Sequence, residues 1–299
     1  MTSPAPAGAA SKVPSISARP VIVAGAGTMG NGIAQTFAAS GHRVLLLEAN
    51  PAALQRGIGT ITKSLGKLVE KGKLSADARD ETLGRIATEP GGFPAGDAVI
   101  AVEAVPEKLE IKREVLRMLD ELLPSGSILA TNTSSISITQ LAAGTTRPQR
   151  FVGMHFMNPV PLMPLVEVVR GMDTTDGTVN ETVELSKALG KTPVVVNDRP
   201  GFVSNRVLLP MINEAAFALM EGVADREAID TVMKLGMNHP MGPLALADLI
   251  GIDVCLDIMN VLHRGFGDSK YRPCPLLQSM VAAGRLGRKT GRGFYEYAS

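Results

Sequence analysis

Short apolar runs alternate with segments of helical periodicity over the first two thirds of the chain. The runs are rich in Val, Ile and Leu and are bounded by Gly, Pro, Asn or Asp, as buried strands usually are. They predict strands at residues 21–24, 44–48, 98–102, 127–130, 151–155, 165–169 and 193–197. Helices are predicted after Gly30 and at residues 111–123 and 181–189. Strands that alternate with helices in this way predict an α/β fold with a doubly wound, mostly parallel sheet of the Rossmann type.

A helical hairpin is predicted as an insertion after the second strand. Asn50 and Pro51 start a helix with apolar residues at i, i+4 and i+7, and a second helix at residues 75–83 follows a break at Gly72. Another face of the first helix carries a row of lysines, namely Lys63, Lys67 and Lys71. Such a row is usually a solvated face, and the alternative is a docking site for an anionic ligand.

The hydrophobic pattern changes after residue 198, and only helical periodicity follows. Helices are predicted at residues 202–221, 226–235, 244–263 and 276–283, with a kink at Pro210 in the first. Because 299 residues exceed one comfortable hydrophobic core, two domains are expected. The predicted boundaries are an α/β domain at residues 20–198 and an all-helical C-terminal domain at residues 199–299.

Composition and charge narrow the choice of partners. The net charge of +1 gives no reason to expect nucleic acid, and no apolar run reaches the roughly 18 residues of a membrane span. Cys255 and Cys274 lack C-x-x-C spacing, so no metal site or redox motif is predicted, and a reducing, cytoplasmic location fits. Residues 1–19 lack the apolar block of a secretory signal. A disordered tail is expected there, with an organellar transit peptide as the alternative.

The first predicted strand leads into a glycine motif, Gly25-Ala-Gly27-Thr28-Met29-Gly30, with the spacing G-x-G-x-x-G. Gly25 permits a tight turn, Gly27 lets a pyrophosphate approach the backbone, and Gly30 lets the next helix pack close to the sheet. The phosphates would bind unpaired N–H groups in the first turn of that helix, around Thr28 and Met29. The motif predicts a dinucleotide site, and the alternative is a glycine turn with only a structural role.

An acidic residue ends the second predicted strand, 18 residues after Gly30. The carboxylate of Glu48 is placed to accept hydrogen bonds from the adenosine ribose of the dinucleotide. Because a carboxylate repels a 2′-phosphate, NAD is the expected cofactor. No arginine follows Glu48 immediately, and Arg56 is the nearest one, which leaves NADP as the alternative.

His155 and Glu167 are the candidates for acid–base chemistry. His155 stands just where a strand ends, at the edge of the sheet that binds ligands in doubly wound folds, and Glu167 lies two strand ends away. Glu167 interrupts an apolar strand, where an unpaired charge would cost about 3–5 kcal/mol. Oxidising an alcohol needs a base for the hydroxyl proton while hydride leaves the carbon, and a carboxylate on the far nitrogen would fix the imidazole tautomer. A structural histidine and a solvent-facing glutamate are the alternatives.

Seven segments together resemble the L-3-hydroxyacyl-CoA dehydrogenases, especially the short-chain 3-hydroxybutyryl-CoA dehydrogenases. These segments are residues 25–30, 132–135, 155–161, 165–167, 200–206, 241–243 and 289–295. As a set they are far more specific than the glycine motif alone, and the likeness extends from Arg19 to Tyr297. The resemblance implies interconversion of (S)-3-hydroxyacyl-CoA and 3-oxoacyl-CoA with NAD(H), an acyl-CoA thioester as substrate, and a homodimer that pairs through the helical domain.

The resemblance also implies roles at single positions. His155 would be the general base and Glu167 its orienting partner. Ser134 would hydrogen-bond the reacting 3-oxygen, and Asn205 would help to hold substrate across the domain cleft. Contacts with acyl-CoA would come from Ser64 and Lys71. Further contacts with the cofactor would come from Glu48, Glu107, Lys112, Ser134 and Lys289.

Three rival functions use similar scaffolds. A β-hydroxyacid or 6-phosphogluconate-type dehydrogenase relies on a lysine in the first interdomain helix, and residues 202–221 contain none. A sugar-acid dehydrogenase of the L-gulonate type lies within the wider resemblance. A non-enzymatic NAD-binding protein with a relic site is disfavoured because the four expected catalytic positions are intact.

Overall fold

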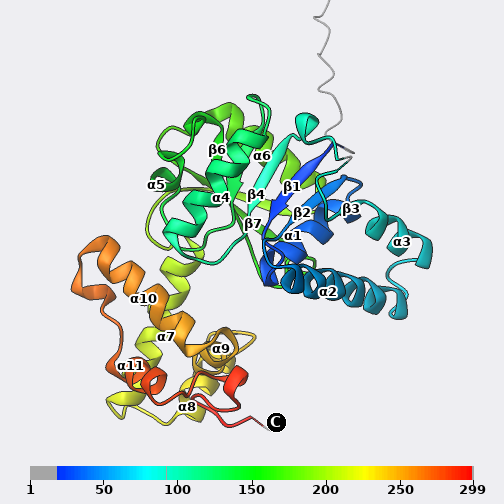
Figure 1. The fold of residues 1–299 in the computed structure, drawn as a ribbon. Helices are drawn as coiled ribbons and strands as arrows, with labels where there is room; N and C mark the ends of the chain where they lie inside the picture. Colours follow the sequence, from blue (N-terminus) through cyan, green and yellow to red (C-terminus); the bar gives the residue numbers. More distant parts are fainter. Residues whose placement is uncertain (1–18, 92, 298–299) are drawn as a thin grey trace, which may run out of the picture.

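An eight-stranded sheet in the order β3-β2-β1-β4-β5-β6-β7-β8 forms the centre of the first part of the molecule (Figure 1). The computed structural model describes residues 19–91 and 93–297, so the tail expected at residues 1–19 lies, apart from Arg19, outside the described residues. All neighbouring strands are parallel except β6 and β7, which confirms the predicted doubly wound, mostly parallel fold. The strands are β1 (Val21–Ala24), β2 (Val44–Leu47), β3 (Ile86–Ala87), β4 (Ile100–Glu103), β5 (Ile128–Thr131), β6 (Phe151–Phe156), β7 (Leu165–Arg170) and β8 (Thr192–Asn197).

Helices cover both faces of this sheet, and each face has its own apolar core. Residues of α1, α2 and α6 pack on one face, and residues of α4 and α5 pack on the other. The hairpin of α2 and α3 projects from the sheet as predicted (Figure 1). Asn50 starts α2 by accepting hydrogen bonds from the backbone of Ala52 and Ala53. The helices are α1 (Thr28–Ala39), α2 (Pro51–Glu70), α3 (Ala76–Gly84), α4 (Leu109–Leu122), α5 (Ile138–Ala142) and α6 (Asp176–Ala188), with short 3₁₀ turns at Ala95–Asp97 and Pro148–Arg150.

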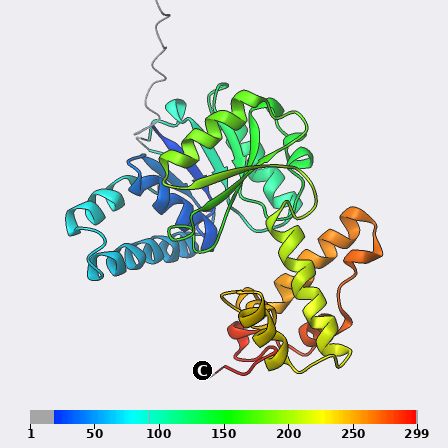
Figure 2. The same cartoon turned by 180° about the vertical axis from the view of Figure 1, so that it is seen from behind.

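The helices after residue 203 have a separate core of their own, and the two parts are called here the sheet domain and the helical domain (Figure 2). Pro210 lies inside the first of these helices, which continues beyond it. Within the described residues, every helix is too short or too polar to cross a bilayer. The helices are α7 (Ser204–Met220), α8 (Arg226–Thr231), α9 (Pro243–Ile250), α10 (Ile252–Phe266) and α11 (Pro275–Ala282), with a π turn at Val232–Gly236 and 3₁₀ turns at Ser269–Tyr271 and Arg288–Thr290.

Three helix boundaries differ from the prediction. The single helix expected at residues 244–263 is two helices, because Gly251 has φ +106° and ends α9. α6 begins five residues before the predicted 181, since the Thr175 hydroxyl caps it by accepting from the Thr178 N–H. α8 passes into the π turn before residue 235. The short elements β3 and α5 were not predicted because two to five residues carry too little periodicity.

The three glycines of the β1–α1 turn differ in their surroundings. Gly25 has φ +104°, and a Cβ there would lie 2.6 Å from the carbonyl oxygen of Ala104. A Cβ on Gly30 would lie 1.8 Å from the carbonyl oxygen of Gly25, so α1 packs against the turn as closely as it does only because residue 30 is glycine. By contrast, a Cβ on Gly27 would meet no atom within 4 Å. Gly27 therefore leaves open space that a ligand can enter.

This contrast predicts opposite effects of two small substitutions. Gly30→Ala should lower Tm by roughly 5–10 °C, because the new methyl group collides with backbone that cannot yield easily. Gly27→Ala should leave Tm within about 1 °C of the wild type but weaken the binding of NADH, because its methyl group enters the space beside the helix N-terminus. Thermal denaturation and NADH fluorescence titration measure the two effects. Equal loss of Tm in both variants would contradict this account of the turn.

Candidate active site

His155 and Glu167 form a buried pair on adjacent strands. They face each other across β6 and β7, and His155 Nδ1 lies 2.7 Å from Glu167 Oε2. The two residues are 7% and 2% exposed. We expected Glu167 to lie two strand ends away from His155. This prediction was wrong, because β6 and β7 are adjacent antiparallel strands in which the two residues pair directly. His155 is also the penultimate residue of β6 rather than a residue just beyond the strand.

The carboxylate of Glu167 is held by the start of the helical domain as well as by the imidazole. Its Oε1 accepts hydrogen bonds from the N–H groups of Val203 (3.2 Å) and Ser204 (2.9 Å), and the Ser204 hydroxyl donates to Oε2 (2.8 Å). Burial alone would raise the pKa of Glu167, but the bonds from His155 and Ser204 outweigh it and hold that pKa below its ordinary value. Glu167 is therefore an acceptor, His155 Nδ1 carries the proton of their bond, and Nε2 is left with a lone pair.

Ser134 and Asn205 lie in the same cleft as His155. The cleft has a volume of about 460 Å³ and extends between the β4, β5 and β6 ends of the sheet domain and helices α7 and α10 of the helical domain. The Asn205 amide donates to the carbonyl oxygen of Ser134 at 3.1 Å, which ties α7 to the β5–α5 loop. The remaining walls are mostly apolar: Met29, Ala104, Val105, Phe156, Met157, Leu208, Leu209, Ile250, Val254 and Ile258.

Glu107 organises the loop that carries Ser134. Its Oε1 accepts hydrogen bonds from the hydroxyl of Thr133 and from the N–H groups of Ser134 and Ser135, at 2.5 to 3.1 Å. Burial would raise the pKa of Glu107, but the charge of Lys112, 3.3 Å from Oε2, and these hydrogen bonds lower it. Glu107 also lines the cleft, so the structure brings this predicted cofactor contact to the site.

Lys112, another predicted cofactor contact, is buried behind this loop. Its side chain is 1% exposed, and its ammonium group donates to both carboxylate oxygens of Glu103 (2.8 and 3.1 Å) and to the carbonyl of Val105. It stands behind Glu107 and stabilises that carboxylate from inside the protein. The cofactor contact expected of Lys112 stays a prediction.

The turn between β1 and α1 fits a dinucleotide. No side chain caps α1, so the N–H groups of its first turn remain for a ligand, and Gly27 faces open space beside them. Glu48 follows β2 directly, and its two oxygens accept from the N–H groups of Ala26 (3.0 Å) and Asn50 (3.1 Å). The carboxylate is thus fixed next to the glycine turn. Met29 in the first turn of α1 reaches the cleft that contains His155.

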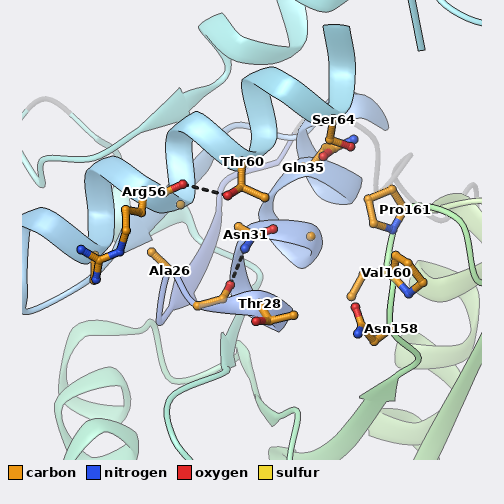
Figure 3. Close-up of a pocket in the computed structure, with 15 residues that line it drawn as sticks. Ala26, Thr28, Asn31, Gln35, Arg56, Thr60, Ser64, Asn158, Val160 and Pro161 are labelled. Atoms are coloured by element: carbon orange, nitrogen blue, oxygen red, sulfur yellow. Dashed lines mark hydrogen bonds between the residues drawn. The ribbon is translucent and has the colours of Figure 1, made fainter. Parts of the chain in front are cut away.

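Two further cavities follow one another from this cleft: the first shares Asn158 with it, and the second shares Ser64 with the first. One, of about 410 Å³, lies between α1, α2 and the segment after β6, and Figure 3 shows Asn31 and Ser64 on two of its walls. The other, of about 320 Å³, is lined by Ser64 and by all three lysines of the predicted row. The structure therefore gathers Ser64 and Lys71, the predicted acyl-CoA contacts, around one pocket.

Lys289 lies on the helical domain and forms an ion pair with Asp253 at 2.5 Å. Asp253 precedes Val254, which lines the cleft. The cofactor contact expected of Lys289 stays a prediction. Sequence reasoning missed Ser204, although it is next to Asn205 in the segment that carries the resemblance. It also missed Asn158, which lines both the His155 cleft and the 410 Å³ cavity.

Comparison with known proteins places the chain in a family. Residues 20–199 match the model for the NAD binding domain of 3-hydroxyacyl-CoA dehydrogenase, and residues 201–297 match the model for its C-terminal domain. The probable 3-hydroxybutyryl-CoA dehydrogenase of Bacillus subtilis is 56% identical over 277 residues, which are 93% of this chain and 96% of the relative. Human mitochondrial hydroxyacyl-coenzyme A dehydrogenase is 41% identical over 284 residues, 93% of this chain and 90% of the relative.

A solved structure agrees with both sequence comparisons. The crystal structure of (S)-3-hydroxybutyryl-CoA dehydrogenase from Ralstonia eutropha superimposes with a TM-score of 0.90 at 51% identity, and the match covers 95% of this chain and all of that one. The predicted resemblance is confirmed, and with it the NAD-binding character of the sheet domain. This chain belongs to the 3-hydroxyacyl-CoA dehydrogenase family.

Proposed function

We propose that this protein interconverts (S)-3-hydroxyacyl-CoA and 3-oxoacyl-CoA with NAD(H), and that its substrates have short chains such as 3-hydroxybutyryl-CoA and acetoacetyl-CoA. The observation that carries the proposal is the buried His155–Glu167 pair, which faces the same cleft as Ser134 and Asn205. The names of the bacterial relatives at 51–57% identity support the short chain length.

His155 acts as the base when the alcohol is oxidised and as the acid when the ketone is reduced. Its Nε2 takes the hydroxyl proton, while Nδ1 keeps its own proton and donates it in the hydrogen bond to Glu167 Oε2 at 2.7 Å. The imidazolium that forms is stabilised by the Glu167 carboxylate, which stays ionised because four hydrogen bonds are directed at it. When bound, the cofactor would exchange hydride with the 3-carbon of the substrate: NAD would accept it on oxidation of the alcohol, and NADH would donate it on reduction of the ketone.

Ser134 and Asn205 position the reacting oxygen. The Ser134 hydroxyl donates to the 3-oxygen. The support is that Ser134 lines the cleft with His155, while Glu107 bonds its N–H and Asn205 bonds its carbonyl. The apolar walls contributed by α7 and α10 exclude water from the proton transfer and strengthen the polar contacts inside the cleft. The lysine pocket with Ser64 and Lys71 supplies positive charge for the phosphates of the acyl-CoA.

Assay of the purified protein for NADH oxidation with acetoacetyl-CoA tests the proposed function. A series of 3-oxoacyl-CoA substrates of increasing chain length, with NADH and NADPH in parallel, should give the highest kcat/KM with the shortest chains and NADH. Absence of turnover with every 3-oxoacyl-CoA, together with turnover of a sugar acid, would replace this function by that of a sugar-acid dehydrogenase.

Replacing His155 by Gln should abolish turnover while NADH still binds. Glutamine fills a similar volume but cannot accept the hydroxyl proton at neutral pH. Steady-state kinetics and NADH fluorescence measure the two effects. Loss of NADH binding in this variant would mean that His155 holds the site together rather than performing the proton transfer.

Replacing Glu167 by Gln should lower kcat by about 10²–10⁴, because a neutral amide no longer stabilises the imidazolium. Ser204→Ala removes only one bond to the same carboxylate and should cause a smaller loss of kcat.

The lowered pKa of Glu167 also predicts how stability depends on pH. The ionised carboxylate stabilises the folded protein above the ordinary carboxyl pKa of 4.5, and this stabilisation is lost as the pH falls from 4.5 through the lowered pKa. The Tm difference between wild type and Glu167→Gln should therefore shrink once the pH falls below 4.5, and a difference that stays constant down to acid unfolding would argue against the ionised pair.

We also infer a homodimer that pairs through the helical domain. The support is the number of large apolar side chains that this domain exposes, namely Val203, Val207, Val223, Val232, Leu235, Met237 and Leu249. Light scattering should give twice the mass of one chain. Leu235→Arg should favour the monomer, whereas Met172→Arg, an equally exposed position in the sheet domain (83% against 81%), should leave the dimer intact. A monomeric wild type would refute the inference.

A cytoplasmic location stays a prediction. Its support is that Cys255 and Cys274 are both free and buried, as in proteins of reducing compartments.

A further inference from the structure

Gln35 is a buried polar residue whose amide has no partner among the described residues. It lies on α1, is 3% exposed, and makes no side-chain hydrogen bond to any of the described residues 19–91 and 93–297. Its polar neighbours on the same helix are satisfied: Asn31 donates to the Gly27 carbonyl at 2.6 Å, and Thr36 donates to the Gly32 carbonyl at 2.8 Å. Buried side-chain amides nearly always have a protein or water partner, so the Gln35 amide is available to a ligand that displaces water beside it.

The amide of Gln35 opens into the cavity between α1 and α2. Figure 3 shows it with Ser64 of α2 and, across the cavity, Val160 and Pro161 of the segment after β6. Among the described residues, the only fully enclosed side-chain nitrogen or oxygen without a partner is Arg150 Nε. The Gln35 amide is therefore not sealed inside the helix packing and is accessible from the cavity.

This cavity lies between the lysine pocket and the catalytic cleft. It shares Thr60, Ser64, Pro159 and Pro161 with the lysine pocket, and it shares Asn158 with the cleft that contains His155. A long ligand with an anionic end at the lysines and a reacting carbon at His155 must therefore pass Gln35. The far wall is held in place, because the Lys191 ammonium donates to the carbonyls of Val160 (2.5 Å) and Met163 (2.9 Å).

We propose that Gln35 binds a secondary amide in the neutral stem of the acyl-CoA thioester. This rests on the proposed function, because the stem that joins the phosphates of coenzyme A to its sulfur contains two secondary amides and no charge. The side chain of glutamine offers N–H donors and a carbonyl acceptor in one plane, which match the carbonyl and the N–H of such an amide. Gln35 thereby positions the thioester between its anionic end and His155.

Gln35→Met tests the proposal, because methionine keeps the length and the apolar packing and removes both hydrogen-bonding functions. KM for acetoacetyl-CoA should rise about tenfold, the effect of losing a neutral hydrogen-bonded contact, while KM for NADH stays unchanged. With an acetoacetyl alkyl thioester that contains no amide, wild type and Gln35→Met should have the same kcat/KM. Thr36→Val, a buried neighbour bonded only to its own helix, is the matched control and should behave as the wild type with both substrates.

Three results would overturn the proposal. One is an unchanged KM for acetoacetyl-CoA in Gln35→Met, and the second is an equal loss with the amide-free thioester, which would make Gln35 a packing residue of α1. The third is a rise in KM for NADH alone, which would assign Gln35 to the dinucleotide, whose glycine turn lines the same cavity.

Calorimetric titration of the same variants with coenzyme A separates this proposal from the proposed function, because it needs no turnover. Weaker binding by Gln35→Met, by about tenfold, supports the amide contact even if no 3-oxoacyl-CoA is reduced. Equal binding by both proteins refutes the contact even if acetoacetyl-CoA is turned over.

Discussion

The carboxylate of Glu167 is the contact on which the active site depends most. It is 2% exposed and carries a charge, and such a charge is stable inside a protein only when its oxygens are fully hydrogen-bonded. One bond comes from His155 of the sheet domain, and the others come from Val203 and Ser204, where the helical domain begins. The orientation of the base and the position of the second domain are therefore set by the same group. The Phe202 ring packs edge-on against the His155 ring, with 5.8 Å between the ring centroids.

The carboxylate of Glu107 holds the loop that carries Ser134, as the carboxylate of Glu167 holds His155. Glu107 gathers Thr133, Ser134 and Ser135 around one oxygen, and Lys112 stabilises its charge from the interior. Lys112 also bonds Glu103, which is 0% exposed and ends β4, so the ammonium lies between two carboxylates. The loop that presents Ser134 is thus fixed by charge-assisted hydrogen bonds rather than by apolar packing, of which a polar loop has little.

The sequence predicted the fold well because strong periodicity and the glycine turn are local signals. Seven of the eight strands and the α2–α3 hairpin could be placed from such signals, whereas β3 was too short to give one. The direction of β7 was missed because the alternation of strands with helices favours parallel pairing. The short β6–β7 connection without a helix was the local signal for an antiparallel pair. The error in the spacing of His155 and Glu167 follows from that strand direction.

For the site, residue type and motif context identified the side chains but not their partners. Lys112 matched a motif position, yet only the packing of α4 on β4 shows that its ammonium group is buried against Glu103. Ser204 and Gln35 carried no separate signal, because a serine at a helix start and a glutamine in a helix are common. Their importance lies in burial and in the presence or absence of a partner, and both are properties of the folded chain.

The antiparallel β6–β7 pair accounts for much of this arrangement. In a parallel pair the chain must return to the opposite edge of the sheet before the next strand, whereas here it turns at the edge where ligands bind. The turn places Glu167 directly across from His155, and the same connecting segment supplies Asn158, Pro159 and Pro161 to the cavities. Burial lowers the pKa of Lys191, whose ammonium nevertheless holds this segment by two carbonyls. The antiparallel direction of β7 therefore places Glu167 beside His155, and it also places the β6–β7 connection along the cavity next to the catalytic cleft.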